Sequence, residues 1–294
     1  MRILVVGGSG FIGRYLARHL ASTLGKEVFC TFRSRPPGDD VNHWYQVELT
    51  DSVALERLFG LIQPEVVVHL AALADVGTAE REPERANAVN VAATENIAAL
   101  CRAHDSRLVF VSTEYVFDGR QGFYGEADSP KPVTHYGRTK LEGELATARL
   151  APDWSVARTS IVYGWPAPGR RNFVTSLVER LQRGETCAGS TQVMRSPVYV
   201  ERLVEGITRL ALDHHPGIHH IAGRDWISMY EFAARVAQGF GLDSGLVVPS
   251  SEESGNPDRL GLDCAATMNR LGLEHPGLAE GLAAMQASPH NPLI

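Results

Sequence analysis

Two side chains that could exchange a proton with a substrate stand four positions apart near the middle of the chain. Tyr136 and Lys140 occur in the segment Tyr-Gly-Arg-Thr-Lys. In a helix this spacing places both on one face, with Cβ atoms roughly 5–6 Å apart. A free tyrosine has a pKa of about 10, and a nearby cation lowers that pKa by favouring the phenolate. The pair could therefore serve a carbonyl or alcohol oxygen, although the same spacing also arises by chance in many helices.

A polar segment precedes this pair. Ser112, Thr113 and Glu114 directly follow the apolar run Leu108–Val111. Ligands of parallel α/β sheets bind beyond the carboxyl ends of the strands, which is where these three side chains would lie. The alternative is a strand-end turn with a surface glutamate. Taken alone, the segment does not decide between the two.

A glycine-rich segment near the N-terminus indicates a phosphate cradle. Gly7, Gly10 and Gly13 satisfy G-x-x-G-x-x-G between the apolar run Ile3–Val6 and a helical pattern. Glycines let the backbone approach a pyrophosphate, and the N-terminus of the following helix offers unpaired N–H groups. A structural glycine turn is the alternative, but a strand before and a helix after the glycines favour a dinucleotide site.

The end of the second predicted strand bears on which dinucleotide binds. An acidic residue there would bind the ribose hydroxyls of NAD, but this chain has Arg33, Ser34 and Arg35. Two guanidinium groups and a hydroxyl suit a 2′-phosphate, whereas a carboxylate would repel it. The segment favours NADP(H), and NAD(H) remains possible because both arginines could simply be solvated.

These groups must be positioned by a regular series of elements. Apolar runs predict strands at Ile3–Val6, Glu27–Phe32, Val66–Leu70, Leu108–Val111 and Ser155–Val162. Helical spacing covers Phe11–Leu24, Ser52–Leu61, Ala86–His104 and Tyr136–Leu150. The runs are nearly continuous Val, Leu and Ile, as in strands covered by helices on both faces. The order predicts an α/β fold with a Rossmann-type doubly wound parallel sheet.

The second half of the chain has a different pattern. Loops that contain Pro and Gly alternate with short helices, such as Val198–Leu212 and Met229–Phe240, and with isolated strands. We expect a dinucleotide-binding domain at residues 1–164, rejoined by about 193–222. Residues 165–294 would then form mainly a smaller C-terminal α/β domain that binds substrate. No low-complexity linker occurs, so the two parts should pack closely.

Composition excludes several classes of partner. The 294 residues include 28 basic and 34 acidic side chains, a net charge of −6, which argues against nucleic acid and anionic membranes as partners. Four cysteines without C-x-x-C spacing suggest neither a zinc site nor a redox pair. The N-terminal apolar run is too short for a signal peptide. A soluble cytoplasmic protein is the resulting expectation.

Together these motifs resemble a known family, the extended short-chain dehydrogenase/reductases, and within it the dTDP-4-dehydrorhamnose reductases. The segments that carry the resemblance are Gly7–Gly13, His69–Leu73, Glu82-Pro83, Asn90-Val91, Ser112–Gly119, Glu126–Pro132, Tyr136–Lys140 and Arg158–Gly164. They cover most of the chain and lie in the family's order. Arg195-Ser-Pro197 also resembles a family segment near the substrate.

The resemblance implies NADPH-dependent reduction of a 4-keto nucleotide sugar, such as dTDP-4-dehydro-L-rhamnose to dTDP-L-rhamnose. It implies that Tyr136 donates the proton, that Lys140 lowers the tyrosine pKa while holding the nicotinamide ribose, and that Thr113 hydrogen-bonds the substrate carbonyl. The family usually has Asp after this threonine, so the role of Glu114 stays open.

The expected site residues follow. The catalytic residues are Thr113, Tyr136 and Lys140. The cofactor-binding residues are Gly7, Gly10, Phe11, Ile12, Gly13, Arg33, Ser34, Arg35, Leu49, Ala71, Ala72, Tyr136 and Lys140. The substrate-binding residues are Thr113, Glu114, Tyr115 and Arg195. No metal is expected, because the histidines of His214–His220 enter a predicted strand whose neighbouring side chains point to opposite faces. A homodimer is a possible assembly.

Three alternatives remain. Sugar dehydratases of the same superfamily typically carry an Asp-Glu pair after the threonine, but here Tyr115 follows Glu114. Dehydration is therefore disfavoured. Nucleotide-sugar epimerases share the Thr-Tyr-Lys set but keep a tightly bound NAD, which Arg33 disfavours. A relative of the reductases serves as a regulatory subunit of methionine adenosyltransferase, so a non-catalytic cofactor-binding protein is the third alternative.

Overall fold

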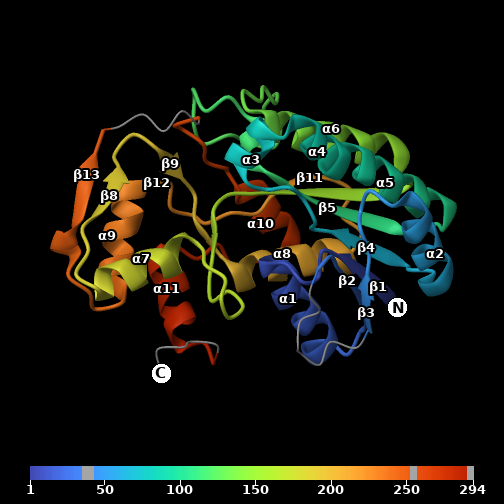
Figure 1. The fold of residues 1–294 in the computed structure, drawn as a ribbon, viewed down its shortest axis with the longest axis horizontal. Helices are drawn as coiled ribbons and strands as arrows, with labels where there is room; N and C mark the ends of the chain where they lie inside the picture. The colour runs from blue at the N-terminus through green and yellow to red at the C-terminus, as the bar shows by residue number, and fades with distance from the viewer. Residues whose placement is uncertain (35–42, 252–256, 290–294) are drawn as a thin grey trace. The chain divides into compact units, whose positions relative to one another are not determined.

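The computed structural model describes residues 1–34, 43–251 and 257–289, in two compact units (Figure 1). The first unit comprises Met1–Val116, Pro130–Arg158 and Val204–His219. The second comprises Phe117–Ser129, Thr159–Leu203 and His220–Ile294. The domain boundary expected after residue 164 stays a prediction.

One seven-stranded sheet forms the centre of the first unit. Its strands are β1 (Arg2–Val6), β2 (Glu27–Phe32), β3 (His43–Gln46), β4 (Val66–His69), β5 (Arg107–Thr113), β6 (Asp153–Thr159) and β11 (Gly217–His220). They lie in the order β11-β6-β5-β4-β1-β2-β3. Strand β1 pairs in parallel with both β2 and β4. The strand order reverses there, which is the point where α/β sheets bind their ligands. The predicted Rossmann-type α/β fold is confirmed.

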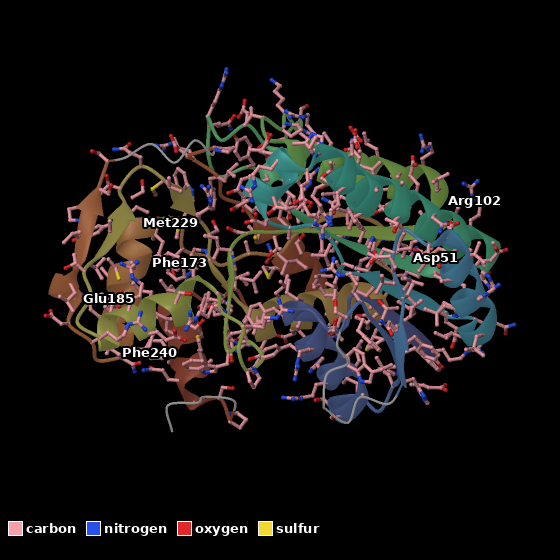
Figure 2. All side chains as sticks on the ribbon, viewed as in Figure 1. Asp51, Arg102, Phe173, Glu185, Met229 and Phe240 are labelled. Atoms are coloured by element: carbon pink, nitrogen blue, oxygen red, sulfur yellow. The ribbon has the colours of Figure 1, made fainter. Side chains whose placement is uncertain are left out.

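Helices cover this sheet. They are α1 (Phe11–Arg18), α2 (Ser52–Ile62), α3 (Val76–Arg81), α4 (Pro83–Asn87), α5 (Ala93–Ala103), α6 (His135–Leu150) and α8 (Val200–Leu212), of which α8 spans both units. Figure 1 shows α2, α5 and α6 on one face and α1 on the other. Asp51, labelled in Figure 2, begins α2 by accepting a hydrogen bond from the Ala54 amide at 3.0 Å. Thr134 begins α6 in the same way, with the Gly137 amide at 3.0 Å.

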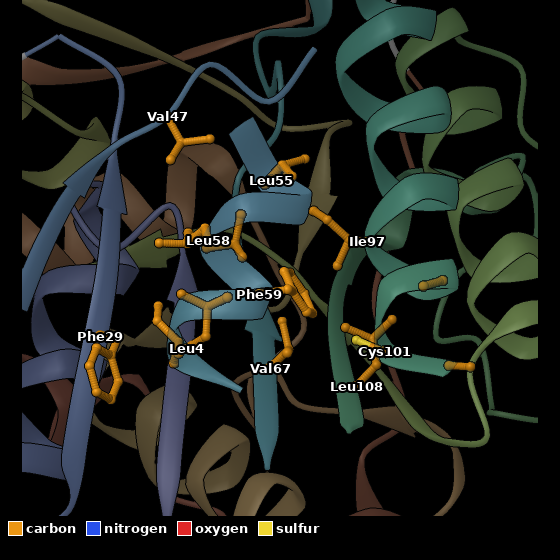
Figure 3. Packing of buried hydrophobic residues seen from close by; sticks show 14 residues of the cluster. Leu4, Phe29, Val47, Leu55, Leu58, Phe59, Val67, Ile97, Cys101 and Leu108 are labelled. Atoms are coloured by element: carbon orange, nitrogen blue, oxygen red, sulfur yellow. The ribbon is translucent and has the colours of Figure 1, made fainter. Parts of the chain in front are cut away.

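Figure 3 shows the core between the sheet and the helices α2 and α5. Leu4, Val67 and Leu108 supply its strand side, and Phe59 and Ile97 supply its helix side. All five are fully buried. Burying a side chain of this size stabilises the fold by about 1.5–3 kcal/mol, so this layer fixes the strand ends on which the polar residues stand.

The second unit is α/β, with short paired strands. Its elements are β7 (Val162–Tyr163), α7 (Phe173–Gln182), β8 (Cys187–Ser190), β9 (Met194–Arg195), β10 (Val198–Tyr199), β12 (Ile227–Ser228), α9 (Met229–Gly239), β13 (Val247–Ser250), α10 (Ala265–Leu271) and α11 (Leu278–Ala287). The pairs are β10-β7, β12-β9 and β13-β8. Phe173, labelled in Figure 2, stacks on Phe232 with ring centroids 5.0 Å apart, which joins α7 to α9.

Several predicted boundaries were wrong. The strand expected through Val162 ends at Thr159, and Val162 pairs with Val198 in a separate short sheet. The strand expected to end at Val111 continues through Thr113. The helix expected over Ala86–His104 contains a wider π-helical turn at Ala88–Ala92. Strand β3 was missed because its sequence, His-Trp-Tyr-Gln, has polar ends and lacks a Val, Ile or Leu run.

Within residues 1–34, 43–251 and 257–289, no helix combines the length and the apolar composition needed to cross a bilayer.

Candidate active site

The glycine segment forms a tight turn between β1 and α1. Gly7 has a φ of 86°, a conformation that favours glycine. A Cβ added at Gly7 would lie 2.8 Å from the Ala71 nitrogen, so the turn packs directly on the loop after β4. A Cβ added at Gly13 would lie 2.3 Å from the Gly7 oxygen. A side chain at either position would thus displace backbone.

The N-terminus of α1 is open to an anion. Helix α1 starts after Gly10 with no side-chain cap and no acidic residue in its first turn, which includes Phe11 and Ile12. The first N–H groups of a helix lack partners inside the helix, and the positive end of its dipole attracts negative charge. A close-packed glycine turn followed by an uncapped helix fits a pyrophosphate.

The end of β2 joins this turn. The Gly7 amide donates to the Thr31 hydroxyl at 2.9 Å. Arg33 and Ser34 follow and are exposed, while the Arg33 carbonyl accepts from the Gln46 side chain at 3.0 Å. Arg33 therefore lies two residues after the threonine that contacts the turn, with its side chain exposed. Arg35 lies outside the described residues.

The remaining expected cofactor residues flank the sheet. Leu49 is half-buried and packs against the core cluster of Figure 3. Ala71 and Ala72 are half-buried in the loop after β4. The Ala71 amide donates to the Val6 carbonyl at 3.1 Å, which holds this loop beside the glycine turn.

Thr113 and Tyr136 meet at the carboxyl end of β5. Thr113 is the last residue of that strand, and Tyr136 lies in the first turn of α6. Their side chains are hydrogen-bonded to each other. The Tyr115 amide donates to the Thr113 hydroxyl at 3.3 Å, and the Tyr115 ring meets that of Tyr136 edge-on at 5.8 Å. A threonine and a tyrosine that are 23 positions apart in sequence thus face one point in space.

Burial controls the charge of this tyrosine. It raises the pKa of Tyr136 to about 12, while the hydrogen bond with Thr113 opposes the rise and the nearby Tyr115 and Glu114 add to it. The sequence predicted a pKa lowered by Lys140, so the net direction is the opposite. The physical reason is that burial disfavours the phenolate. At neutral pH Tyr136 therefore keeps its proton, as a proton donor must.

Lys140 lies one turn further along α6. Its Nζ stands 3.9 Å from the centroid of the Phe110 ring, a cation–π distance. Burial lowers the pKa of Lys140 to about 7, and the charge of Glu144 opposes that change. The ammonium is therefore close to losing its charge at neutral pH.

Asn90, to which the sequence assigned no role, joins two parts of the site. Its side-chain oxygen accepts from the Leu73 amide at 2.8 Å, and its nitrogen donates to Thr139 at 3.0 Å. Thr139 in turn donates to the Tyr136 carbonyl at 2.8 Å. Asn90 thus ties the loop after β4 to the turn of α6 that carries Tyr136. The signal in the sequence was a polar residue between two valines in an otherwise helical stretch.

Glu114 and Arg195 have different surroundings. Glu114 is buried in the short turn Glu114–Val116 that follows Thr113. Arg195 belongs to the second unit and is 3% exposed. Its guanidinium donates to the carbonyls of Met194, Asp258 and Pro257 at 2.8, 3.0 and 2.9 Å. These bonds hold the chain around Pro257, and a phosphate contact by Arg195 stays a prediction.

The histidines of the predicted strand also contact carbonyl oxygens. The ring of His219 bonds the His215 oxygen at 2.9 Å, and that of His220 bonds the Asp263 oxygen at 3.2 Å. Within the described parts of the chain, no three His, Cys, Asp or Glu side chains gather as metal ligands would. The four cysteines are buried and unbridged.

Comparison with known proteins adds a family and relatives. Residues 1–287 match the family described as RmlD substrate binding domain. A crystal structure described as a hypothetical dTDP-4-dehydrorhamnose reductase from Sulfolobus tokodaii superposes with a TM-score of 0.85 at 31% identity. The superposition covers 96% of this chain and 99% of that one.

Two curated relatives have different roles. Methionine adenosyltransferase 2 subunit beta from Danio rerio is 32% identical over 92% of this chain and 85% of its own length. A probable low-salt glycan biosynthesis reductase from Haloferax volcanii is 30% identical over 98% of both chains. One is a subunit of another enzyme and one is a reductase, so similarity alone does not select the activity.

Proposed function

The chain belongs to the RmlD substrate binding domain family, and from that premise we propose that it is an NADPH-dependent reductase of 4-keto nucleotide sugars. The substrate we propose is dTDP-4-dehydro-L-rhamnose, with dTDP-L-rhamnose as product. The observation that carries the proposal is the hydrogen bond between Thr113 and the protonated Tyr136 at the end of a parallel strand. Ligands of such sheets bind at this end.

We assign cofactor binding, substrate binding and proton transfer to different residues of the site. The turn Gly7–Gly13 and the open end of α1 would hold the pyrophosphate of the cofactor. A bound nicotinamide supplies the hydride for the carbonyl carbon. Thr113 would hold the carbonyl oxygen by a hydrogen bond, and Tyr136 would give that oxygen its proton. Lys140 would stabilise the phenolate that Tyr136 becomes.

Consumption of NADPH tests this function. The purified chain is mixed with NADPH and dTDP-4-dehydro-L-rhamnose, and the loss of NADPH is followed together with the formation of dTDP-L-rhamnose. We expect both in equal amounts. If neither this compound nor related 4-keto nucleotide sugars consume NADPH, the reductase assignment is wrong.

Arg33 should decide the choice between cofactors. Arg33→Asp replaces a cation that would bind the 2′-phosphate with an anion that would repel it. We expect the ratio of kcat/KM for NADPH over NADH to fall at least about 10-fold, because a hydrogen bond to a charged group contributes about 1.5–3 kcal/mol. Arg57→Asp, an exposed position on α2, makes the same charge change and should leave the ratio unaltered. An unchanged ratio in Arg33→Asp would remove this residue from the 2′-phosphate site.

A regulatory subunit is the second candidate, and the 32% identity to a methionine adenosyltransferase subunit favours it. Co-purification of the tagged chain with methionine adenosyltransferase from the same cells tests this function. A stoichiometric complex without turnover of keto sugars would support regulation. Turnover without such a complex would support the reductase.

A further inference from the structure

Glu144 and Arg158 form a buried ion pair one helical turn beyond Lys140. Glu144 is one helical turn after Lys140 on α6, and Arg158 is on β6. Their side chains are 4% and 1% exposed. Arg158 Nε and Nη2 donate to the two carboxylate oxygens of Glu144 at 2.9 and 2.7 Å. This two-point contact fixes the orientation of the carboxylate as well as its charge.

The same carboxylate reaches the strand that ends in Thr113. The Ser112 hydroxyl donates to Glu144 Oε1 at 2.5 Å. Ser112 directly precedes Thr113 at the end of β5. Glu144 therefore connects α6, β5 and β6. Its contact on β5 is next to Thr113, and its place on α6 is one turn after Lys140.

Glu144 supplies the negative charge that Lys140 needs. Lys140 and Glu144 are four positions apart on one helix, so they share a face. Burial opposes the charge of Lys140, and Glu144 opposes that effect. Two other ionisable groups near Lys140 are His69, whose pKa the Lys140 charge also lowers, and Tyr136, which lies one turn earlier on α6. Tyr136 is protonated, and burial lowers the pKa of His69 to about 3, so both are neutral at pH 7.

Burying an ion pair rarely stabilises a protein, because desolvation cancels most of the attraction. Replacing both partners by apolar side chains is often neutral or stabilising. Stability alone therefore does not explain the Glu144–Arg158 pair. Its place one helical turn from Lys140 suggests an effect on the charge of that lysine.

We propose that Glu144 is a positioning residue that keeps Lys140 charged, and that Arg158 and Ser112 hold its carboxylate in place for that purpose. This inference rests on the proposed reductase function, in which a charged Lys140 stabilises the Tyr136 phenolate. Glu144 touches neither substrate nor cofactor in this account.

The composition of the chain makes the charge of Lys140 measurable. The sequence contains three lysines, Lys26, Lys131 and Lys140. With lysine labelled by ¹³C at the side chain, NMR would show one signal for each. Loss of a signal in Lys140→Met identifies Lys140. Its titration is independent of any substrate, so this test can succeed or fail separately from the reductase assignment.

Glu144→Gln removes the charge but keeps the shape of the side chain. We expect the titration midpoint of Lys140 to fall from about 7 by about one pH unit, because a nearby opposite charge shifts a pKa by about 1–3 units. At pH 7 the charged fraction would drop from about one half to about one tenth. Turnover at pH 7 should fall about five-fold, and the alkaline limb of the kcat profile should move about one unit toward acid.

Glu142→Gln is the matched control, since Glu142 lies on the exposed face of the same helix. Glu142→Gln should change neither the titration midpoint of Lys140 nor the pH profile of kcat. If Glu144→Gln does not fold, the double variant Glu144→Gln/Arg158→Met removes both charges and should fold with the Lys140 midpoint still lowered.

The outcomes separate the two proposals. A Lys140 midpoint that stays at its wild-type value in a folded Glu144→Gln or double variant overturns the inference, whatever the enzyme reduces. A lowered midpoint with a shifted kcat profile supports it. A lowered midpoint in a chain that reduces no keto sugar supports the link between Glu144 and Lys140 and removes the proposed function alone.

Discussion

Tyr136→Phe should lower turnover of the keto sugar by about 10²–10⁴-fold, the range that general acid catalysis contributes. Phenylalanine keeps the ring that packs against Tyr115 but lacks the hydroxyl proton. Steady-state kinetics with saturating NADPH measures the loss. The dissociation constant of NADPH should change little, because the glycine turn and α1 are untouched.

Tyr45→Phe is the matched control, because Tyr45 packs against the core cluster of the first unit on strand β3. It should keep nearly full turnover. Retention of wild-type turnover by Tyr136→Phe would show that another group donates the proton. Loss of NADPH binding in the same variant would instead show that the substitution disturbed the cofactor site.

Gly13→Ala should weaken NADPH binding by about 10- to 100-fold. The added methyl would lie 2.3 Å from the Gly7 oxygen and 2.8 Å from the Gly8 Cα, both of them backbone atoms. Forcing an extra carbon into a packed site costs about 1–3 kcal/mol, and the turn must move away from the anion site to accept it. Calorimetric titration with NADPH measures the effect.

Gly60→Ala provides the comparison. Gly60 is an exposed position inside α2 with nothing within 4 Å of an added Cβ. Alanine there should raise the free energy of unfolding by about 0.5–1 kcal/mol, because glycine is the poorer helix former. NADPH binding should not change. Equal affinity for NADPH in Gly13→Ala and the wild-type chain would contradict the assignment of the turn as the cofactor site.

The sheet and its glycine turn could be predicted because their signals are local. Continuous apolar runs such as Ile3–Val6 define buried parallel strands, and the glycine spacing appears in one short segment. The predicted helix at Ser52–Leu61 differs from α2 by one residue, since Asp51 is a local cap. Strand β3 is short and polar at both ends, and its pairing with β2 is a long-range contact that no local pattern reveals.

Residues of the candidate site could be selected from the sequence, but their pKa shifts could not. Tyr136 and Lys140 could be found by spacing, and the structure brings Thr113 to Tyr136. Burial raises the pKa of Tyr136 and lowers that of Lys140. This burial depends on the packing of α6 against β5 and the loop after β4. The contacts of Asn90 and of the Glu144–Arg158 pair were missed, because the partners of these side chains lie on other elements.

The central claim is hydride transfer to C4 of a nucleotide sugar, and transfer of deuterium tests it most directly. The chain is incubated with NADPH deuterated at the transferable position and with dTDP-4-dehydro-L-rhamnose, and the product is examined by NMR and mass spectrometry. We predict one deuterium at C4 of dTDP-L-rhamnose for each NADPH oxidised. Recovery of the keto sugar without deuterium and without oxidation of NADPH would contradict the reductase account.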